Sequence, residues 1–385
     1  MLLNSIGMMG EVVVLGWLTL ELTDSPFLVG VAMGMRALPL FFVGAPAGAL
    51  ADRFPRHRLL MVTGVGQALT ACTLGTLTLL GLVTLTPVLL LTLAAGVLRG
   101  VEHAARQSYT HDVVGGPALV HGLAVLGVAM RSGWLLGSLG VGAIIARYGS
   151  GVAYFAVAAG FLAGAAALAA AAAPAPMAAG RTRASLWRSM GTLYTAVRAD
   201  HALLWLMLLT AGAEVLGFAH QALLPSLARD VLKSGPEGLG VLNAARSVGG
   251  ILGLVVVMTR GSTLGGGALF LGVLGTFGAS LIVLGVAPHV VGFAGVVLVL
   301  IVANAAGALA DLLAQSLLQL SVPSHLRGQA GGAWVVAIGL APVGQLQIGA
   351  LASLFGVSIA LGASGLALTV LAGTAALWLP RVRRL

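Results

Sequence analysis

The chain has 385 residues, of which 59% are hydrophobic and only 8% are charged. A soluble globular domain carries roughly 25% charged residues, so this composition excludes an ordinary water-soluble protein. The basic residues that give the formal charge of +9 do not gather in one patch. Strongly and weakly basic loops alternate along the chain, and we therefore expect no nucleic-acid partner.

Twelve apolar runs follow one another along the chain, each long enough for a spanning helix of about 20 residues. Because backbone polar groups must be satisfied internally within the bilayer, runs of this length predict helices rather than barrel strands. The expected fold class is all-α integral membrane, with twelve transmembrane helices in two pseudo-symmetric six-helix bundles. The predicted spans are 2–22, 26–50, 59–82, 86–108, 117–146, 151–174, 201–229, 237–260, 264–286, 290–318, 326–353 and 356–379.

Several of these spans contain ionisable residues, although each costs at least about 2.5 kcal/mol to insert into a bilayer. We predict that they line a cavity for coupling or substrate binding, with Glu11 and Glu214 as the sites of coupling or of contact with a cationic substrate, and Arg131 as a partner of either glutamate. Purely structural ion pairing is the alternative. The predicted cavity residues are Glu11, Arg36, Arg131, Glu214, Arg246 and Asp311.

The fourth predicted span contains an arginine and a glutamate three positions apart, Arg99 and Glu102. Side chains at this spacing lie on the same face of a helix. We therefore predict a structural ion pair between them.

The loop after the second predicted span reads GALADRFPRHR, residues 48–58. A glycine here allows close helix contact, and an aspartate at a helix end can accept backbone N–H bonds or pair with arginine. The stretch resembles the signature of the major facilitator superfamily, Gly-x-x-x-Asp-Arg followed by a glycine and a basic cluster, although Pro55 stands where the glycine is usual. The resemblance implies a latch that closes the cytoplasmic side in the outward-facing state; a basic loop that only sets topology is the alternative. The latch residues are Gly48, Asp52, Arg53, Arg56 and Arg58.

Four further stretches are similar to the exporter branch that includes enterobactin-exporter-like and macrolide-efflux-like proteins. They are LTDSPFLVG at 22–30, AARQ at 104–107, GFAHQALLPSLARDVL at 217–232 and HLRG at 325–328. The fifth predicted span departs from this branch, because it lacks the Gly-Pro pair common in exporters. The resemblance implies efflux of small molecules.

The two halves of the chain share an internal repeat. A shift of 210 residues places Pro26, Gly30 and Arg36 on Pro236, Gly240 and Arg246. Parallel repeats of this kind place a substrate cavity between the halves near the middle of the membrane. We predict an N-terminal six-helix bundle at 1–174, a cytoplasmic linker at 175–200 that is either an amphipathic helix or a solvated segment, and a C-terminal six-helix bundle at 201–385.

The distribution of basic residues predicts the topology. Most loop arginines fall on one side of the span map, including Arg181, Arg183 and Arg188, and the positive-inside rule then places both termini in the cytoplasm of a bacterial plasma (inner) membrane. We find neither HExxH nor GxxxxGK[ST] in the sequence, so we expect no metal, no cofactor and no enzymatic activity.

These observations favour a proton-coupled exporter, an antiporter, of amphipathic small molecules of the drug or siderophore type. We expect it to act by alternating access as a monomer in the lipid bilayer, with protons as the coupling ion. The alternatives are a facilitator or importer of small solutes, and a lipid flippase or non-transporting membrane receptor. The sequence does not identify the substrate.

Overall fold

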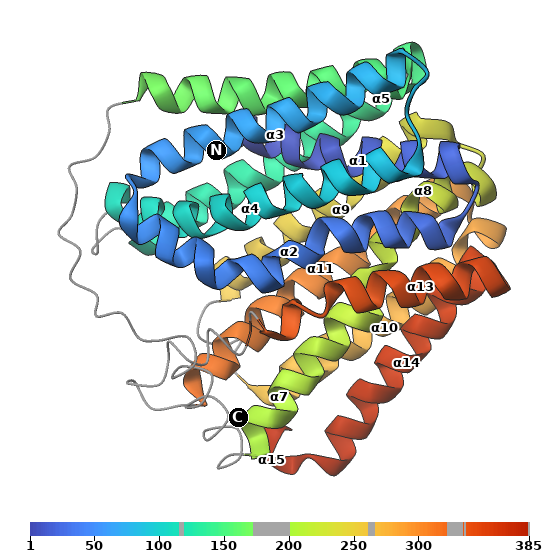
Figure 1. Ribbon diagram of the computed structural model, residues 1–385. Helices are drawn as coiled ribbons and strands as arrows, with labels where there is room; N and C mark the ends of the chain where they lie inside the picture. Colours follow the sequence, from blue (N-terminus) through green and yellow to red (C-terminus); the bar gives the residue numbers. More distant parts are fainter. Residues whose placement is uncertain (115–118, 172–200, 261–265, 322–333, 335, 384–385) are drawn as a thin grey trace. The chain divides into compact units, whose positions relative to one another are not determined.

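The computed structural model describes residues 1–385 except 115–118, 172–200, 261–265, 322–333, 335 and 384–385 (Figure 1). The elements found in the described residues are all helices. Side chains at some helical positions, notably most of 44–53, are also outside the description. The predicted all-helical fold is confirmed, and the predicted linker at 175–200 lies outside the described residues.

The first part of the chain forms five long helices. Ser25 caps the second of these through its side chain, which accepts a hydrogen bond from the Leu28 backbone N–H, and Pro26 occupies the first helical position. The helices are α1 (Leu2–Thr23), α2 (Pro26–Arg53), α3 (Arg56–Leu79), α4 (Leu85–Val114) and α5 (Leu119–Ala170).

Helix α5 unites the fifth and sixth predicted spans in one 52-residue element with a sharp bend at Gly149. This residue has φ 81° and ψ 170°, a conformation that only glycine adopts without strain. The boundary between the predicted spans 117–146 and 151–174 therefore coincides with the bend at Gly149.

The later part of the chain begins with an irregular helix. It starts as α7 (His201–Gly212) and continues through a π-helical turn η1 (Ala213–Gly217), a 3-10 segment η2 (Phe218–Leu223), a short α8 (Leu224–Ser226) and a second π turn η3 (Leu227–Val231). Regular helices follow: α9 (Gly235–Arg260), α10 (Gly267–Val290), α11 (Gly292–Leu320), α13 (Ala341–Phe355), α14 (Val357–Trp378) and the short α15 (Pro380–Arg383).

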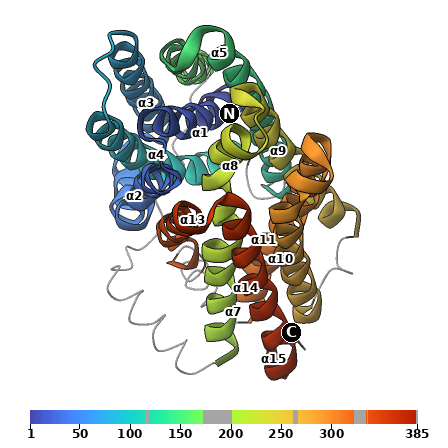
Figure 2. The same cartoon turned by 90° about the vertical axis from the view of Figure 1, so that its right-hand side faces the viewer.

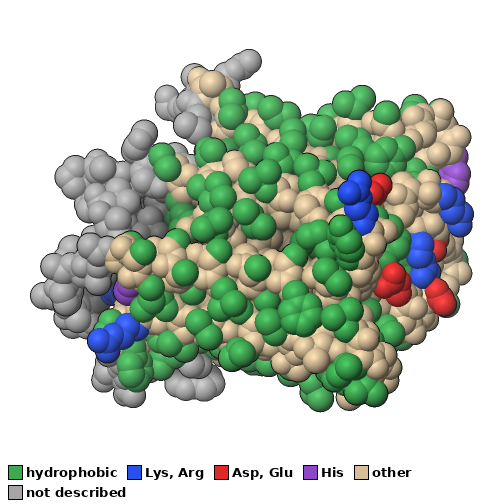
Figure 3. All heavy atoms as spheres, turned by 90° about the horizontal axis from the view of Figure 1, so that it is seen from above, with side chains coloured by type: hydrophobic (Ala, Val, Ile, Leu, Met, Phe, Trp, Pro, Cys, Tyr) green, Lys and Arg blue, Asp and Glu red, His purple; other side chains and the backbone are tan. Residues whose placement is uncertain are grey.

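Ten helices in the described part of the chain are long and apolar enough to cross a membrane. One of these ten, residues 125–170, is 46 residues long, and the bend at Gly149 divides it in two. A shorter apolar helix covers Pro26–Leu40. The described residues thus supply about ten to twelve apolar helices. Figure 3 shows a face covered largely by hydrophobic side chains and backbone, with charged groups mainly toward one margin.

The helices form two compact units, one of residues 1–181 with 233–244 and the other of residues 182–232 with 245–385. In the first unit α1 and α3 both lie against α5, and α2 lies beside α4 (Figures 1 and 2). In the second unit α10 lies against both α11 and α14.

Small residues permit this close packing. A Cβ at Gly160 of α5 would lie 3.1 Å from the backbone nitrogen of Gly7 on α1, and a Cβ at Gly365 of α14 would lie 2.6 Å from the carbonyl oxygen of Gly278 on α10. Helices in a membrane associate largely through such close contacts, which accounts for the use of 56 glycines.

Candidate functional site

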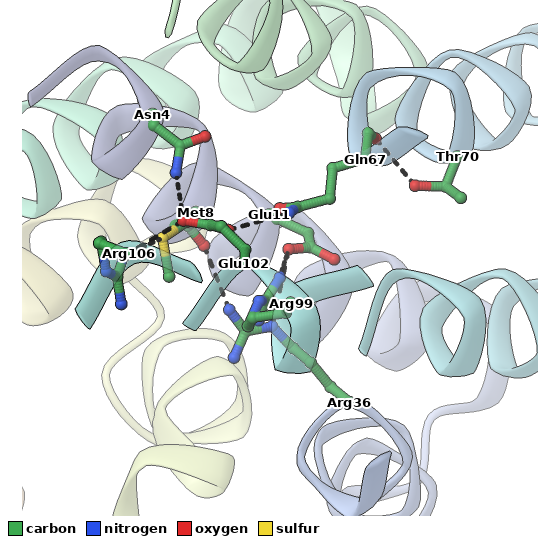
Figure 4. A network of polar contacts seen from close by, with 9 residues as sticks. All are labelled: Asn4, Met8, Glu11, Arg36, Gln67, Thr70, Arg99, Glu102 and Arg106. Atoms are coloured by element: carbon green, nitrogen blue, oxygen red, sulfur yellow. Dashed lines mark hydrogen bonds and ion pairs between the residues drawn. The ribbon is translucent and has the colours of Figure 1, made fainter. Parts of the chain in front are cut away.

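A buried carboxylate on α1 connects three helices of the first unit. Glu11 lies midway along α1 with only 7% of its surface exposed. Its carboxylate forms an ion pair with Arg99 of α4 and a second one with Arg36 of α2, whose Nε lies 3.7 Å from Glu11 Oε2. Figure 4 shows the three side chains converging from their separate helices. The predicted cavity residues Glu11 and Arg36 are therefore in contact.

A second buried carboxylate, Glu102 of α4, lies beside this group (Figure 4). Asn4 of α1 donates a hydrogen bond to its Oε1 at 2.8 Å, and Gln67 of α3 donates to its Oε2 at 2.9 Å. Arg106, one turn further along α4, donates to Oε1 at 3.2 Å. Both oxygens of Glu102 are thus occupied, and this residue connects α1, α3 and α4.

The predicted ion pair between Arg99 and Glu102 is wrong. Arg99 pairs with Glu11, and Glu102 pairs with Arg106 at i,i+4. The spacing of three places Arg99 and Glu102 on one face of α4, but α1 packs nearby and brings Glu11 to Arg99. Packing between α1 and α4 therefore determines the partner of Arg99. Residue spacing along α4 describes only the contacts within that one helix.

The Arg99 guanidinium has spare donor capacity. Its Nε and Nη1 are buried without a hydrogen-bond partner among the described residues. Buried donors are normally satisfied by protein or by ordered water. The group around Glu11 can therefore accept a further polar atom beside an existing ion pair.

Arg131 of α5 lies over the ring of Trp134, with its guanidinium carbon 5.7 Å from the ring centroid. This is a cation–π contact between residues three positions apart on one helix. A glutamate partner was predicted for Arg131, and the contact with Trp134 was not predicted.

The second unit contains the remaining predicted cavity residues. Glu214 lies in the π turn η1, is partly buried and interacts electrostatically with Asp311 of α11. Asp311 accepts a hydrogen bond from Trp334 Nε1 at 3.0 Å, and Arg246 of α9 donates one to Gln221 Oε1 at 2.7 Å. Glu214 and Asp311 thus influence each other electrostatically, and Arg246 bonds an amide.

The two predicted coupling glutamates have different environments. Glu11 is paired with two arginines, whereas the charge that acts on Glu214 is that of a second carboxylate, Asp311.

The irregular geometry of residues 213–231 and the buried histidine within it were not predicted from the sequence. His220 is fully buried, with Nδ1 2.7 Å from the Gly217 carbonyl oxygen and Nε2 3.5 Å from Asn304 Nδ2. π turns inside helices occur often at functional sites. Gly217 and Pro225, both poor helix formers, are the only local signals of this irregularity in the sequence.

The predicted latch is only partly visible. Gly48, Asp52 and Arg53 belong to the last turns of α2, but their side chains lie outside the described residues. Arg56 begins α3, and Arg58 is exposed in the same turn. The latch stays a prediction.

The described residues form long apolar helices that bury several charged side chains, and the match of the whole chain to a family model makes this protein a membrane transporter of the major facilitator type. The chain belongs to the transmembrane secretion effector family, whose family model matches residues 1–385. No curated protein matches the chain significantly.

Solved structures of transporters share this fold. One of nucleoside transporter NupG superposes with a TM-score of 0.78 at 13% identity, covering 97% of this chain and 98% of that chain. A bacterial homolog to the human lysosomal transporter Spinster gives 0.76 at 13% identity, with coverages of 99% and 95%. A peptide transporter POT in complex with sulfate gives 0.79 at 15% identity, with coverages of 99% and 93%. At these identities the similarity establishes the fold alone.

Proposed function

We propose that this chain is a proton-coupled exporter of amphipathic small molecules. It acts as a monomer in a bacterial inner membrane with both termini in the cytoplasm, by alternating access between residues 1–174 and 201–385. The observation that carries the proposal is the buried group formed by Glu11, Arg36 and Arg99.

This group links protonation to helix contacts. A carboxylate at membrane depth is tolerable only when it is hydrated, paired or protonated. A proton on Glu11 removes its charge and weakens both ion pairs at once. Because the three residues come from α1, α2 and α4, protonation changes how α1 is held against two other helices. A coupling site must link proton binding to a change in helix contacts, and this group meets that requirement.

The pair of carboxylates in the second unit suits a positively charged cargo. Glu214 and Asp311 repel each other when both are ionised. A proton on either carboxylate, or a cationic group near them, relieves this repulsion. The remaining helix surface is largely apolar, since only 8% of all residues are charged. An amphipathic cation matches both features.

The direction of transport rests on sequence similarity. The stretches at 22–30, 104–107, 217–232 and 325–328 resemble exporters, and the family is described as secretion effectors. The nucleoside and peptide transporters of similar fold have too little identity to assign an importer's substrate.

A transport assay in proteoliposomes tests the proposal. An inside-acidic pH gradient is imposed, and uptake is measured for amphipathic cations, a siderophore, nucleosides and dipeptides. We expect uptake of amphipathic compounds that depends on the gradient. Glu11→Gln should abolish this dependence.

Glu21→Gln is the matched control, because Glu21 lies on the same helix but is exposed and bonds Trp17 and Ser150 rather than arginine. It should retain gradient-driven uptake. Uptake of nucleosides or dipeptides alone would instead favour a facilitator or importer, and the absence of any transport would favour a flippase or receptor.

A further inference from the structure

An apolar groove lies between α7 and α14 of the second unit. Its volume is about 330 Å³, and its walls include Trp205 and Leu208 of α7 and Leu371 and Thr374 of α14, with Trp378 and Leu379 at one end. Figures 1 and 2 show the two helices side by side, with α15 at their end. From Leu371 to Trp378 the groove follows α14 for about 10 Å, given a rise of 1.5 Å per residue. That is about two thirds of the thickness of one hydrocarbon leaflet, which is about 15 Å.

The groove carries aromatic side chains that favour the membrane interface. Trp378 is 81% exposed and Trp205 is 39% exposed. Both side chains are large and amphipathic. Indole rings concentrate at the boundary between hydrocarbon and headgroups. We therefore place the end of the groove near Leu379 at headgroup level.

Two arginines lie directly beyond that end. Arg381 and Arg383 are exposed on α15, and no ion pair to either is found in the part of the chain that the structure describes. Val382 between them is buried at 1% exposure, and α15 contacts α7, α10 and α14. The short helix is therefore anchored against these helices, with its two arginines two and four residues beyond Leu379, the last residue that lines the groove.

We propose that this groove binds one anionic phospholipid, with an acyl chain between α7 and α14 and the phosphate group on Arg381 and Arg383. The apolar walls match the acyl chain, and the two guanidinium groups match a phosphate, for which arginine has the best donor geometry. A zwitterionic lipid fits the groove equally well but gains less from the arginines. The site therefore selects by headgroup charge.

The test is a lipid titration of the purified full-length protein in detergent, followed by native mass spectrometry. Phosphatidylglycerol is compared with phosphatidylcholine that carries the same acyl chains. We expect one tightly retained phosphatidylglycerol and weaker retention of phosphatidylcholine. Replacing both arginines (R381Q with R383Q) should weaken phosphatidylglycerol binding roughly 30-fold, or about fivefold for each arginine.

Two further variants separate the groove from the charges. Thr374→Trp fills the groove at an exposed position and should reduce retention of both lipids with the arginines intact. Arg147→Gln changes an exposed arginine of the first unit and should leave retention unchanged. Equal retention of the two lipids, full retention after loss of both arginines, or displacement of the lipid by free glycerol phosphate would each overturn the proposal.

Discussion

The pairing of Glu11 with Arg99 can be measured as an interaction energy. At an effective dielectric constant of about 20, the 3.7 Å separation of Arg36 and Glu11 corresponds to about 4.5 kcal/mol of Coulomb attraction before desolvation is counted. The contact with Arg99 is closer, and the side chains of Arg99 and Glu11 are only 14% and 9% exposed. After the desolvation cost, we expect a coupling energy of about 2 to 3 kcal/mol for Glu11 and Arg99.

The assay is a double-mutant cycle with E11Q, R99Q and the double variant. The free energy of unfolding is measured by reversible denaturation in mixed micelles of dodecylmaltoside and SDS. Each single variant should be destabilised by about 3 kcal/mol, because E11Q leaves the buried Arg99 without its counter-ion and R99Q leaves Glu11 with only the longer contact to Arg36. The double variant should be destabilised by clearly less than the sum.

A second cycle with R99Q and E102Q serves as the internal control. The structure assigns these two residues to different partners, so their coupling energy should be under about 1 kcal/mol. The reasoning from the structure is refuted if Arg99 couples more strongly to Glu102 than to Glu11.

Three further predictions concern function and topology. Glu11→Gln should abolish proton-driven uptake into inverted vesicles and Glu214→Gln should lower it, while substrate exchange without a gradient survives in at least one variant; full gradient-driven transport by both variants would make these glutamates structural. Asp52→Asn should shift the resting population toward the inward-facing state, as measured by cysteine accessibility from each side, and unchanged labelling would eliminate the latch. Reporter fusions near Gly180 should show cytoplasmic activity, whereas periplasmic activity would reverse the proposed topology.

The helical membrane fold was predictable because apolar length alone specifies a spanning helix. The start of α1 and the position of α14 agree with the predicted spans within about two residues. The bend at Gly149 also falls between two predicted spans. What hydropathy could not predict was the change from α to π and 3-10 geometry at 213–231, since backbone irregularity leaves the apolar composition unaltered.

Two residues of the group around Glu11 could be singled out from the sequence, but its ion pairing could not. Glu11 and Arg36 stood out because a charge inside an apolar run is costly, and both lie in one group in the structure. Their link to Arg99 depends on how α4 packs near α1. Residue spacing along a single helix carries no information about that packing. Asn4 and Gln67 escaped notice because neutral polar residues give a weak signal in a membrane sequence, although both bond Glu102.

Proton movement that accompanies substrate efflux tests the central claim most directly. Proteoliposomes are loaded with a transported amphipathic cation and a pH-sensitive dye, and are then diluted into substrate-free buffer at the same pH. The proposed antiport predicts that the lumen acidifies as substrate leaves, and that Glu11→Gln abolishes this acidification while Glu21→Gln preserves it. Efflux with no change in luminal pH, or with alkalinisation, would contradict a proton-coupled exporter.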